Sequence, residues 1–313
     1  NDWNGMDIFI DFEGVESAYY VWVNGELAGY AEDSRLPSHF NITKLLKKGK
    51  NRLAVKVFRY SDGSYLEGQD YWKYSGIERS VYVYARPQNR VKDFHLTAGL
   101  TNQYKDGTLD LDIMLHQPQP GEKVEMKVLD KDQCLWQTEK MINSVHDTLF
   151  HSKHLFTDIL PWNAETPNLY DFSVSLFLSK EDLENQNAKD KIESYFGLRE
   201  ISILEIEGKN RICLNKKPVF LHGVLDQGYF VDGIYLPKAE DGFRKDIQNM
   251  KSLGINTLRK HIKIEPEIFY YECDKAGMLV MQDMVNNGSY NFIRDTAIPT
   301  VFSKNGLRYH LKD

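Results

Sequence analysis

Residues 253–284 read LGINTLRKHIKIEPEIFYYECDKAGMLVMQDM, and this stretch decides the fold of the last third of the chain. Segments 255–258 and 278–281 predict two short strands, and the second of them is continuously apolar. Between them, Phe269 and Cys273 share one face of a predicted helix. Strands that are apolar on both faces and alternate with helices are typical of a parallel sheet. The stretch therefore predicts a β-α-β unit.

The same alternation extends upstream. A short apolar run at 219–221 predicts a preceding strand, and residues 240–253 predict a helix that Gly254 ends. The apolar face of this helix consists of Phe243, Ile247, Met250 and Leu253. A closed (β/α)8 barrel needs roughly 250 residues and one unit roughly 30. Residues 198–313 therefore hold the first three β/α units of a TIM barrel, which is incomplete here.

Residues 88–197 predict a second, all-β domain. About seven segments alternate apolar and polar residues, most clearly at 109–115, 124–128 and 172–178, with turn residues between them. Seven short strands in about 110 residues favour an immunoglobulin-like sandwich. No cysteine pair stands where an antibody-type disulfide would join the sheets, which excludes that subclass.

Residues 1–87 predict a third domain, also of β-strands. We expect about six strands, two short of a jelly roll, so a smaller complete sandwich stays open. Asn24-Gly25 lies between alternating segments and predicts a tight hairpin, because a type I′ turn needs positive φ at both positions. The stretch from Arg59 to Arg79 predicts a long loop, either functional or an assembly surface.

Composition excludes several classes of protein. The 313 residues carry 39 Lys+Arg and 45 Asp+Glu, a net charge of −6 without long single-sign blocks, which disfavours nucleic acid as a partner. No apolar run approaches the roughly 18–20 residues of a membrane helix. Three distant cysteines form neither a zinc pattern nor a disulfide framework, which favours the cytoplasm and leaves a periplasmic or secreted protein open. Aromatic residues make up 12% of the chain, and their flat rings suit both β-sheet cores and sugar C–H faces.

Polar side chains follow each of the three predicted parallel strands. Because parallel strands bring their carboxyl ends to one face, these side chains should lie close together. Hydroxyl-rich ligands need donors and acceptors of this kind, although solvated loop residues would look the same. The candidates are His222, Asp226 and Gln227 after the first strand; Arg259, Lys260 and His261 after the second; and Gln282, Asp283, Asn286 and Asn287 after the third.

Several long segments carry a resemblance to a known family. VWVNGELAGYAEDSRLPSHFNIT (21–43), GKNRLAVKVFR (49–59) and SDGSYLEGQDYWKYSGIER (61–79) resemble the sugar-binding domain of β-galactosidases of glycoside hydrolase family 2. PWNAETPNLY (161–170) is similar to the family's sandwich domain, and NKKPVFLHGVLDQGY (215–229) with residues 253–284 resembles the start of its catalytic barrel. The resemblance spans nearly the whole chain in the family's order.

The resemblance implies a retaining β-glycosidase that uses two glutamates about 5–5.5 Å apart. In the family these glutamates come from later barrel strands, and this chain contains no Glu after Glu272. Glu240, Glu265 and Glu267 lack the Asn-Glu context of the acid/base residue. We therefore expect an N-terminal fragment that lacks the catalytic glutamates and is inert by itself.

The resemblance also implies roles for single residues. Asp33 matches the carboxylate that reaches the sugar hydroxyls, and Arg259 matches an arginine that organises the catalytic glutamates. His261 is offset by one from the family's usual histidine. Asp226 and Gln227 stand where galactosidases often have Arg-His, and Asp283 aligns with an acidic position. Asn287-Gly288-Ser289 replaces a magnesium-binding Glu-x-His, so no metal site and no cofactor are expected.

The leading hypothesis is therefore a piece of an enzyme that hydrolyses terminal β-galactosides, with a β-linked oligosaccharide or galactoside as substrate. A non-catalytic carbohydrate-binding or scaffold protein is the alternative. Three β/α units leave an open sheet edge, which predicts self-association, including a homo-oligomer.

Overall fold

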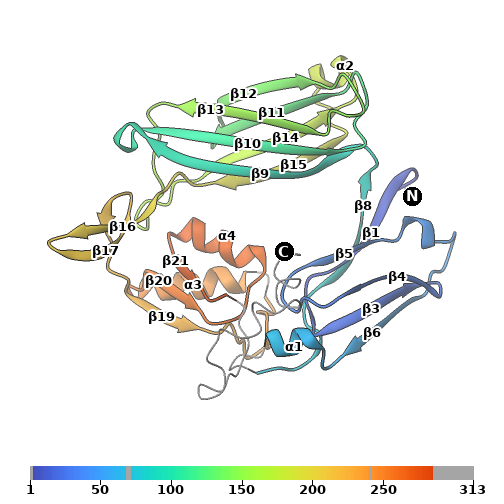
Figure 1. Ribbon diagram of the computed structural model, residues 1–313, viewed down its shortest axis with the longest axis horizontal. Helices are drawn as coiled ribbons and strands as arrows, with labels where there is room; N and C mark the ends of the chain where they lie inside the picture. Colours follow the sequence, from blue (N-terminus) through green and yellow to red (C-terminus); the bar gives the residue numbers. More distant parts are fainter. Residues whose placement is uncertain (1–2, 68–71, 240, 285–313) are drawn as a thin grey trace, which may run out of the picture. The chain divides into compact units, whose positions relative to one another are not determined.

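The computed structural model describes residues 3–67, 72–239 and 241–284 and shows a mainly β protein (Figure 1). The chain divides into two compact units. The first unit contains residues 1–6, 86–222 and 273–279, and the second contains residues 7–85, 223–272 and 280–313. Within the described residues, no helix combines the length and the apolar character that a membrane crossing requires.

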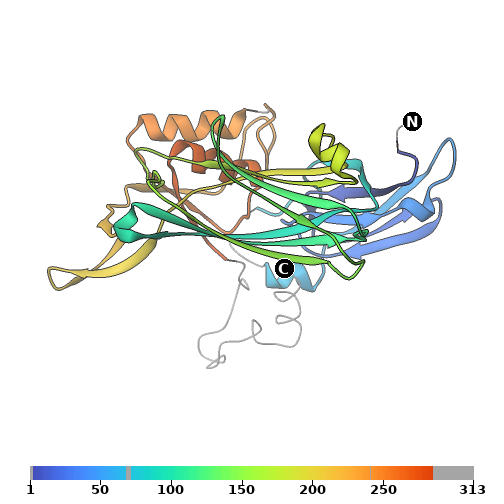
Figure 2. The same cartoon turned by 90° about the horizontal axis from the view of Figure 1, so that it is seen from above.

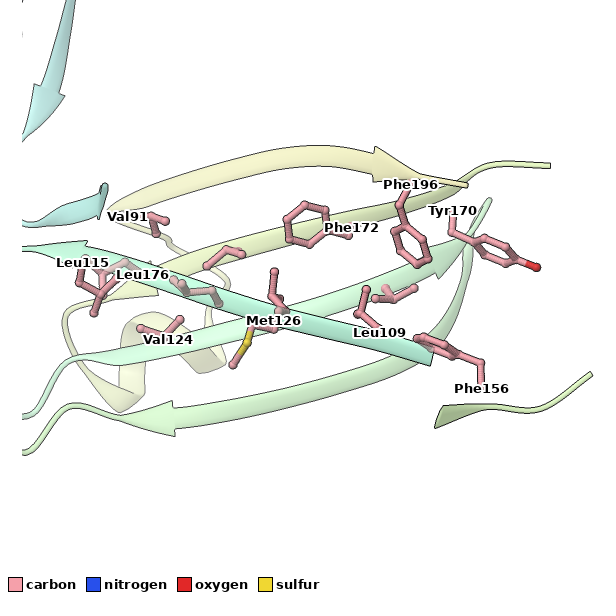
Figure 3. Close-up of a cluster of buried hydrophobic side chains, with 14 of the residues drawn as sticks. Val91, Leu109, Leu115, Val124, Met126, Phe156, Tyr170, Phe172, Leu176 and Phe196 are labelled. Carbon is pink, nitrogen blue, oxygen red and sulfur yellow. The ribbon is translucent and has the colours of Figure 1, made fainter. Parts of the chain in front are cut away.

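The first unit is built around a sandwich of two antiparallel sheets. One sheet has the order β13-β10-β9 and the other β12-β11-β14-β15. Alternate residues of both sheets are fully buried between the layers, as Leu109, Met126 and Phe172 show (Figure 3). The seven predicted strands of an immunoglobulin-like sandwich are thereby confirmed. They are β9 (Arg90–Thr101), β10 (Asp106–His116), β11 (Lys123–Asp130), β12 (Gln133–Met141), β13 (Leu149–Phe156), β14 (Tyr170–Phe177) and β15 (Asp190–Phe196), with the short helix α2 (Lys180–Glu184) after β14.

A hairpin that the sequence analysis did not separate from the β/α region follows the sandwich. It consists of β16 (Ile201–Ile206), β17 (Lys209–Leu214) and β18 (Lys217–Pro218). Glu207 and Gly208 both have positive φ, 53° and 73°, as a two-residue hairpin turn requires. Both views show the hairpin extending away from the sandwich (Figure 1, Figure 2).

The first unit also anchors the last turn of helix α4 (Glu267–Ala276). The indole of Trp162, 1% exposed, donates from Nε1 to the carbonyl oxygen of Asp274 at 2.7 Å. The carboxylate of Asp274 accepts from Arg199 at 2.6 Å and from the Tyr195 hydroxyl at 3.0 Å. Asp274 thus connects the end of the helix to three side chains of the first unit through its carbonyl oxygen and its carboxylate.

The second unit begins with a sandwich of short strands. Its sheets have the orders β5-β1-β8, β4-β3-β6 and β2-β7, and its core contains Phe12, Tyr19 and Val21. Asn24 and Gly25 have φ of 55° and 89° at the β3–β4 turn, which confirms the predicted hairpin. The strands are β1 (Met6–Phe12), β2 (Val15–Glu16), β3 (Ala18–Val23), β4 (Glu26–Ala31), β5 (Ser38–Asn41), β6 (Leu53–Phe58), β7 (Gly76–Ile77) and β8 (Val81–Pro87), with a 3-10 helix at Thr43–Leu45.

Eight strands replace the six that we expected from the sequence. The additional ones, β2 and β7, have only two residues each, too few to produce an alternation. The predicted loop from Arg59 to Arg79 is also less irregular than expected, because it contains β7 and the short helix α1 (Asp62–Leu66).

The predicted β/α units lie in the second unit, except for residues 273–279, which belong to the first. Strands β19 (Gly223–Asp226), β20 (Thr257–Lys260) and β21 (Leu279–Gln282) form one sheet, and α3 (Gly242–Ser252) and α4 alternate with them. β19 and β20 pair in parallel, with Asp226 opposite Lys260. Gly223 permits this pairing, since a Cβ there would lie 2.8 Å from the carbonyl oxygen of Thr257.

The sequence placed these elements slightly too early. The first strand is not 219–221, where Phe220 is 83% exposed, but Gly223–Asp226. The second strand begins two residues later than expected, at Thr257. Leu253, assigned to the apolar face of α3, is 71% exposed, whereas Phe243 and Ile247 are buried as predicted. Asn286, Asn287, Gly288 and Ser289 lie outside the described residues.

Candidate functional site

Several candidate residues do not follow their strands, as the sequence suggested, but lie within or before them. Asp226 is the last residue of β19, and Arg259 and Lys260 end β20, so all three belong to strands. His222 precedes β19 and therefore does not follow the first strand, which corrects its assignment. Gln227 and His261 are the first residues after their strands.

A network of buried charges joins these strand ends. The ammonium of Lys260, a residue with no exposed surface, lies 2.8 Å from the Asp226 carboxylate and 2.6 Å from that of Glu265. Lys263, 1% exposed, pairs with the same Glu265 carboxylate at 2.9 Å. Buried charges persist only when paired in this way, since an unpaired one is strongly destabilising.

Lys263 also fastens the loop that follows β19. Its Nζ donates to the carbonyl oxygens of Gly228, at 2.5 Å, and Tyr235, at 2.9 Å. Between these points Phe230 and Ile234 exchange two backbone hydrogen bonds of 2.7 and 2.8 Å. One ammonium thus holds both ends of a closed loop, defined here as the Gly228–Tyr235 loop. Burial, with Lys260 contributing, lowers the pKa of Lys263 to about 8.

Gly228 is the point where this loop passes closest to the charges. Its φ is +65°, and an added Cβ would lie 2.6 Å from the Lys260 ammonium and 2.7 Å from that of Lys263. Its amide donates to the Asp226 carboxylate at 2.7 Å. Only glycine fits here, for both the backbone conformation and the space.

Two further pairs of predicted residues lie in contact. Gln227 Nε2 and His261 Nδ1 are 2.8 Å apart, and because an amide nitrogen only donates, Nδ1 accepts. Arg259 holds Asp283 with two hydrogen bonds, of 3.1 Å from Nε and 3.0 Å from Nη2. These hydrogen bonds raise the pKa of Arg259 above its usual value.

Asp33 lies between β4 and β5, where it is half-buried. Its neighbour Arg35 is buried, forms ion pairs with Glu16, at 3.6 Å, and with Glu78, and places its guanidinium 4.5 Å from the ring centre of Tyr235. The segment 33–35 is therefore in contact with the Gly228–Tyr235 loop through Arg35 and Tyr235. That Asp33 itself reaches a sugar stays a prediction.

Lys263, Glu265, Tyr229 and Tyr235 are the participants that the sequence analysis missed. The sequence held one signal for Lys263 and Glu265, which are charged residues shortly after strand β20, and none for the two tyrosines. Among the described residues, no group of three or more His, Cys, Asp or Glu is placed to hold a metal ion. That the chain needs no cofactor stays a prediction.

The described residues thus form a sandwich of short strands, an immunoglobulin-like sandwich and β/α units with polar residues at the strand ends. Residues 1–87 match the profile of "Glycosyl hydrolases family 2, sugar binding domain", and residues 89–199 match "Glycosyl hydrolases family 2". The chain belongs to glycosyl hydrolase family 2.

Relatives and solved structures agree with this family. The chain is 34% identical to a β-galactosidase of Pseudoalteromonas haloplanktis over 285 residues, covering 88% of this chain and 26% of that protein. It is 34% identical to a β-galactosidase of Priestia megaterium over 307 residues, covering 94% and 28%. The chain thus spans about a quarter of the length of the curated relatives it matches. A crystal structure of Bacteroides uniformis β-glucuronidase superposes with a TM-score of 0.79 at 20% identity, covering 91% of this chain and 35% of that one, and shares the fold.

Proposed function

We propose that this chain supplies part of the sugar-binding site of a retaining β-glycosidase that acts on terminal β-galactosides. The sugar contacts are Asp33, Asp226, Gln227, Arg259, His261 and Asp283. We propose galactosides and not glucuronides as substrates, because the relatives at 34% identity are named β-galactosidases. The similarity to a β-glucuronidase is one of fold.

The contact between predicted residues at the strand ends carries the proposal. Asp226 with Lys260, Gln227 with His261, and Arg259 with Asp283 form three polar pairs at the ends of neighbouring strands. Each pair offers both hydrogen-bond donors and acceptors, and each sugar hydroxyl can bind one donor and one acceptor. Arg259 and Asp283 hold each other in a planar, two-bond geometry, which fixes the direction of their remaining hydrogen-bonding groups.

The same pairing argues for binding rather than bond cleavage by these carboxylates. A carboxylate that cleaves the glycosidic bond has to face the substrate, whereas the carboxylates here are engaged by cations. Asp226 and Glu265 both lie against Lys260, and Asp283 lies against Arg259. The proton donor and the nucleophile would therefore come from glutamates outside this chain, and the chain alone would be inert.

Two measurements test the proposal. Calorimetry should detect binding of D-galactose to the chain, and Asp33→Ala should weaken it at least fivefold, whereas Asp132→Ala, at an exposed turn of the sandwich, should not. The chain alone should release no nitrophenol from a nitrophenyl β-galactoside above a mock-purified control. Turnover above that control, or galactose binding that is unaffected by Asp33→Ala, would contradict the proposal.

A non-catalytic carbohydrate-binding protein is the second candidate, favoured by the cation beside each of these carboxylates. The coding sequence after Asp313 distinguishes the two. A frame that continues into barrel strands with an Asn-Glu pair and a later Glu supports the enzyme, and a stop codon supports the binding protein.

A further inference from the structure

Trp72 is an exposed indole on a fixed backbone. Trp72 is 66% exposed, although tryptophan side chains are highly buried on average. It belongs to the stretch from Arg59 to Arg79 that the sequence marked as functional or as an assembly surface. Trp72 therefore presents a large, flat apolar surface to solvent.

Two tyrosines of the Gly228–Tyr235 loop hold the main chain of Trp72. The Tyr229 hydroxyl accepts from the Trp72 amide at 2.9 Å, and the Tyr235 hydroxyl donates to the Trp72 carbonyl oxygen. The two tyrosines stand at the two ends of the loop that Lys263 fastens. The main-chain N–H and C=O of Trp72 are thus both fixed by a loop that is itself closed and anchored on a buried charge.

The rings around Trp72 form a small aromatic surface. The Tyr229 ring centre lies 5.2 Å from that of Trp72, and the Tyr74 ring centre lies 6.2 Å from it. Tyr74, 46% exposed, packs edge-on against Tyr235 at 5.2 Å. This arrangement holds Trp72 in place from one side and leaves most of its surface open to solvent.

The position of this surface points to its ligand. Tyr229 follows Gln227 by two residues, and Gln227 pairs with His261 at the proposed sugar site. A flat, immobilised indole offers a face for the C–H side of a pyranose ring, and fixing it before binding removes the entropy cost of ordering it. The Tyr229 ring centre lies 5.9 Å from the Lys263 ammonium, and Lys263 shares the Glu265 carboxylate with Lys260, which pairs with Asp226 of the proposed sugar site. This chain of contacts connects the aromatic surface with the proposed sugar site.

We infer that Trp72, supported by Tyr74, Tyr229 and Tyr235, forms a stacking subsite for the sugar unit next to the terminal galactose. The inference rests on the proposed function and deepens it, because it names a disaccharide or longer β-galactoside as the ligand. A simple alkyl galactoside would not use this subsite.

Calorimetric titration of the chain with galactose and with lactose tests the inference. Lactose should bind about tenfold more tightly than galactose, a factor typical of one additional aromatic contact. Trp72→Ala should abolish this preference and leave galactose affinity within twofold, whereas Trp72→Phe should restore part of it. Trp3→Ala is the matched control, since Trp3 is also exposed, at 46%, and should retain the full preference.

The outcomes separate the two proposals. If galactose binds and lactose binds no more tightly, or if the preference persists in Trp72→Ala, the subsite is refuted and the proposed function stands. If galactose does not bind the wild-type chain at all, the proposed function is refuted and the subsite falls with it.

Discussion

Replacing Lys263 with methionine tests whether a buried ammonium holds the Gly228–Tyr235 loop. The variant keeps the length and volume of the side chain but leaves two carbonyl oxygens without their donor and Glu265 with one cation instead of two. Removing one partner of a buried ion pair costs about 3–5 kcal/mol. Because Glu265 retains Lys260, we expect the lower end of that range, about 3 kcal/mol at neutral pH.

The pH dependence of the difference in unfolding free energy between wild type and Lys263→Met shows whether the buried ammonium of Lys263 causes it. The pKa of Lys263 is lowered from 10.5 to about 8 in the folded chain, so the unfolded chain binds more protons between these values. Stability therefore rises with pH in this window, by about 2 kcal/mol between about pH 7 and pH 9.5. The gap between wild type and Lys263→Met should widen by the same amount, because the variant has no group to titrate there.

Urea unfolding followed by tryptophan fluorescence, at several pH values across this window, measures the gap. Lys245→Met in α3 is the matched control, because the Lys245 side chain is 65% exposed and its removal should leave both stability and its pH dependence nearly unchanged. A gap that stays constant or narrows as the pH rises would refute a lysine whose pKa is lowered by burial.

Three further predictions concern the same region. Gly228→Ala should lower the free energy of unfolding in urea by about 3 kcal/mol, because the new Cβ would be strained at positive φ and would overlap its neighbours. Gly25→Ala is also at positive φ but has open space around it, so it should cost only about 1 kcal/mol. Equal losses in the two variants would contradict the crowding at Gly228. Tyr235→Phe removes one hydroxyl that holds Trp72 and should reduce the lactose preference in calorimetry by about threefold, and an unchanged preference would show that the clamp is dispensable. Arg259→Lys cannot form two parallel hydrogen bonds and should weaken galactose binding without shifting the urea midpoint, so an unchanged galactose affinity would remove Arg259 from the site.

Local signals predicted the elements whose cause is local. The Asn24-Gly25 turn followed from backbone conformation alone, and the seven sandwich strands followed from alternation. The second β/α strand extends two residues beyond its predicted end, to the buried Lys260. Its burial depends on Asp226, 34 residues away in the chain, and no local pattern reveals a partner at that distance.

The candidate site was predicted in part, for a similar reason. The predicted convergence of strand ends is seen in three contacts: Asp226 with Lys260, Gln227 with His261, and Arg259 with Asp283. The role of Lys263 could not be predicted, because its acceptors are main-chain carbonyls, 35 and 28 residues away, that the sequence does not distinguish.

Because both ends of the Gly228–Tyr235 loop are fixed, its tip is suited to the insertion of additional residues. Val231 at the tip is fully exposed, and the bridge between Phe230 and Ile234 lies between it and the anchored tyrosines. Residues inserted after Val231 would lengthen a surface excursion whose closure entropy grows only slowly with length. New recognition segments could therefore be grafted there without changing the spacing of the two hydroxyls below.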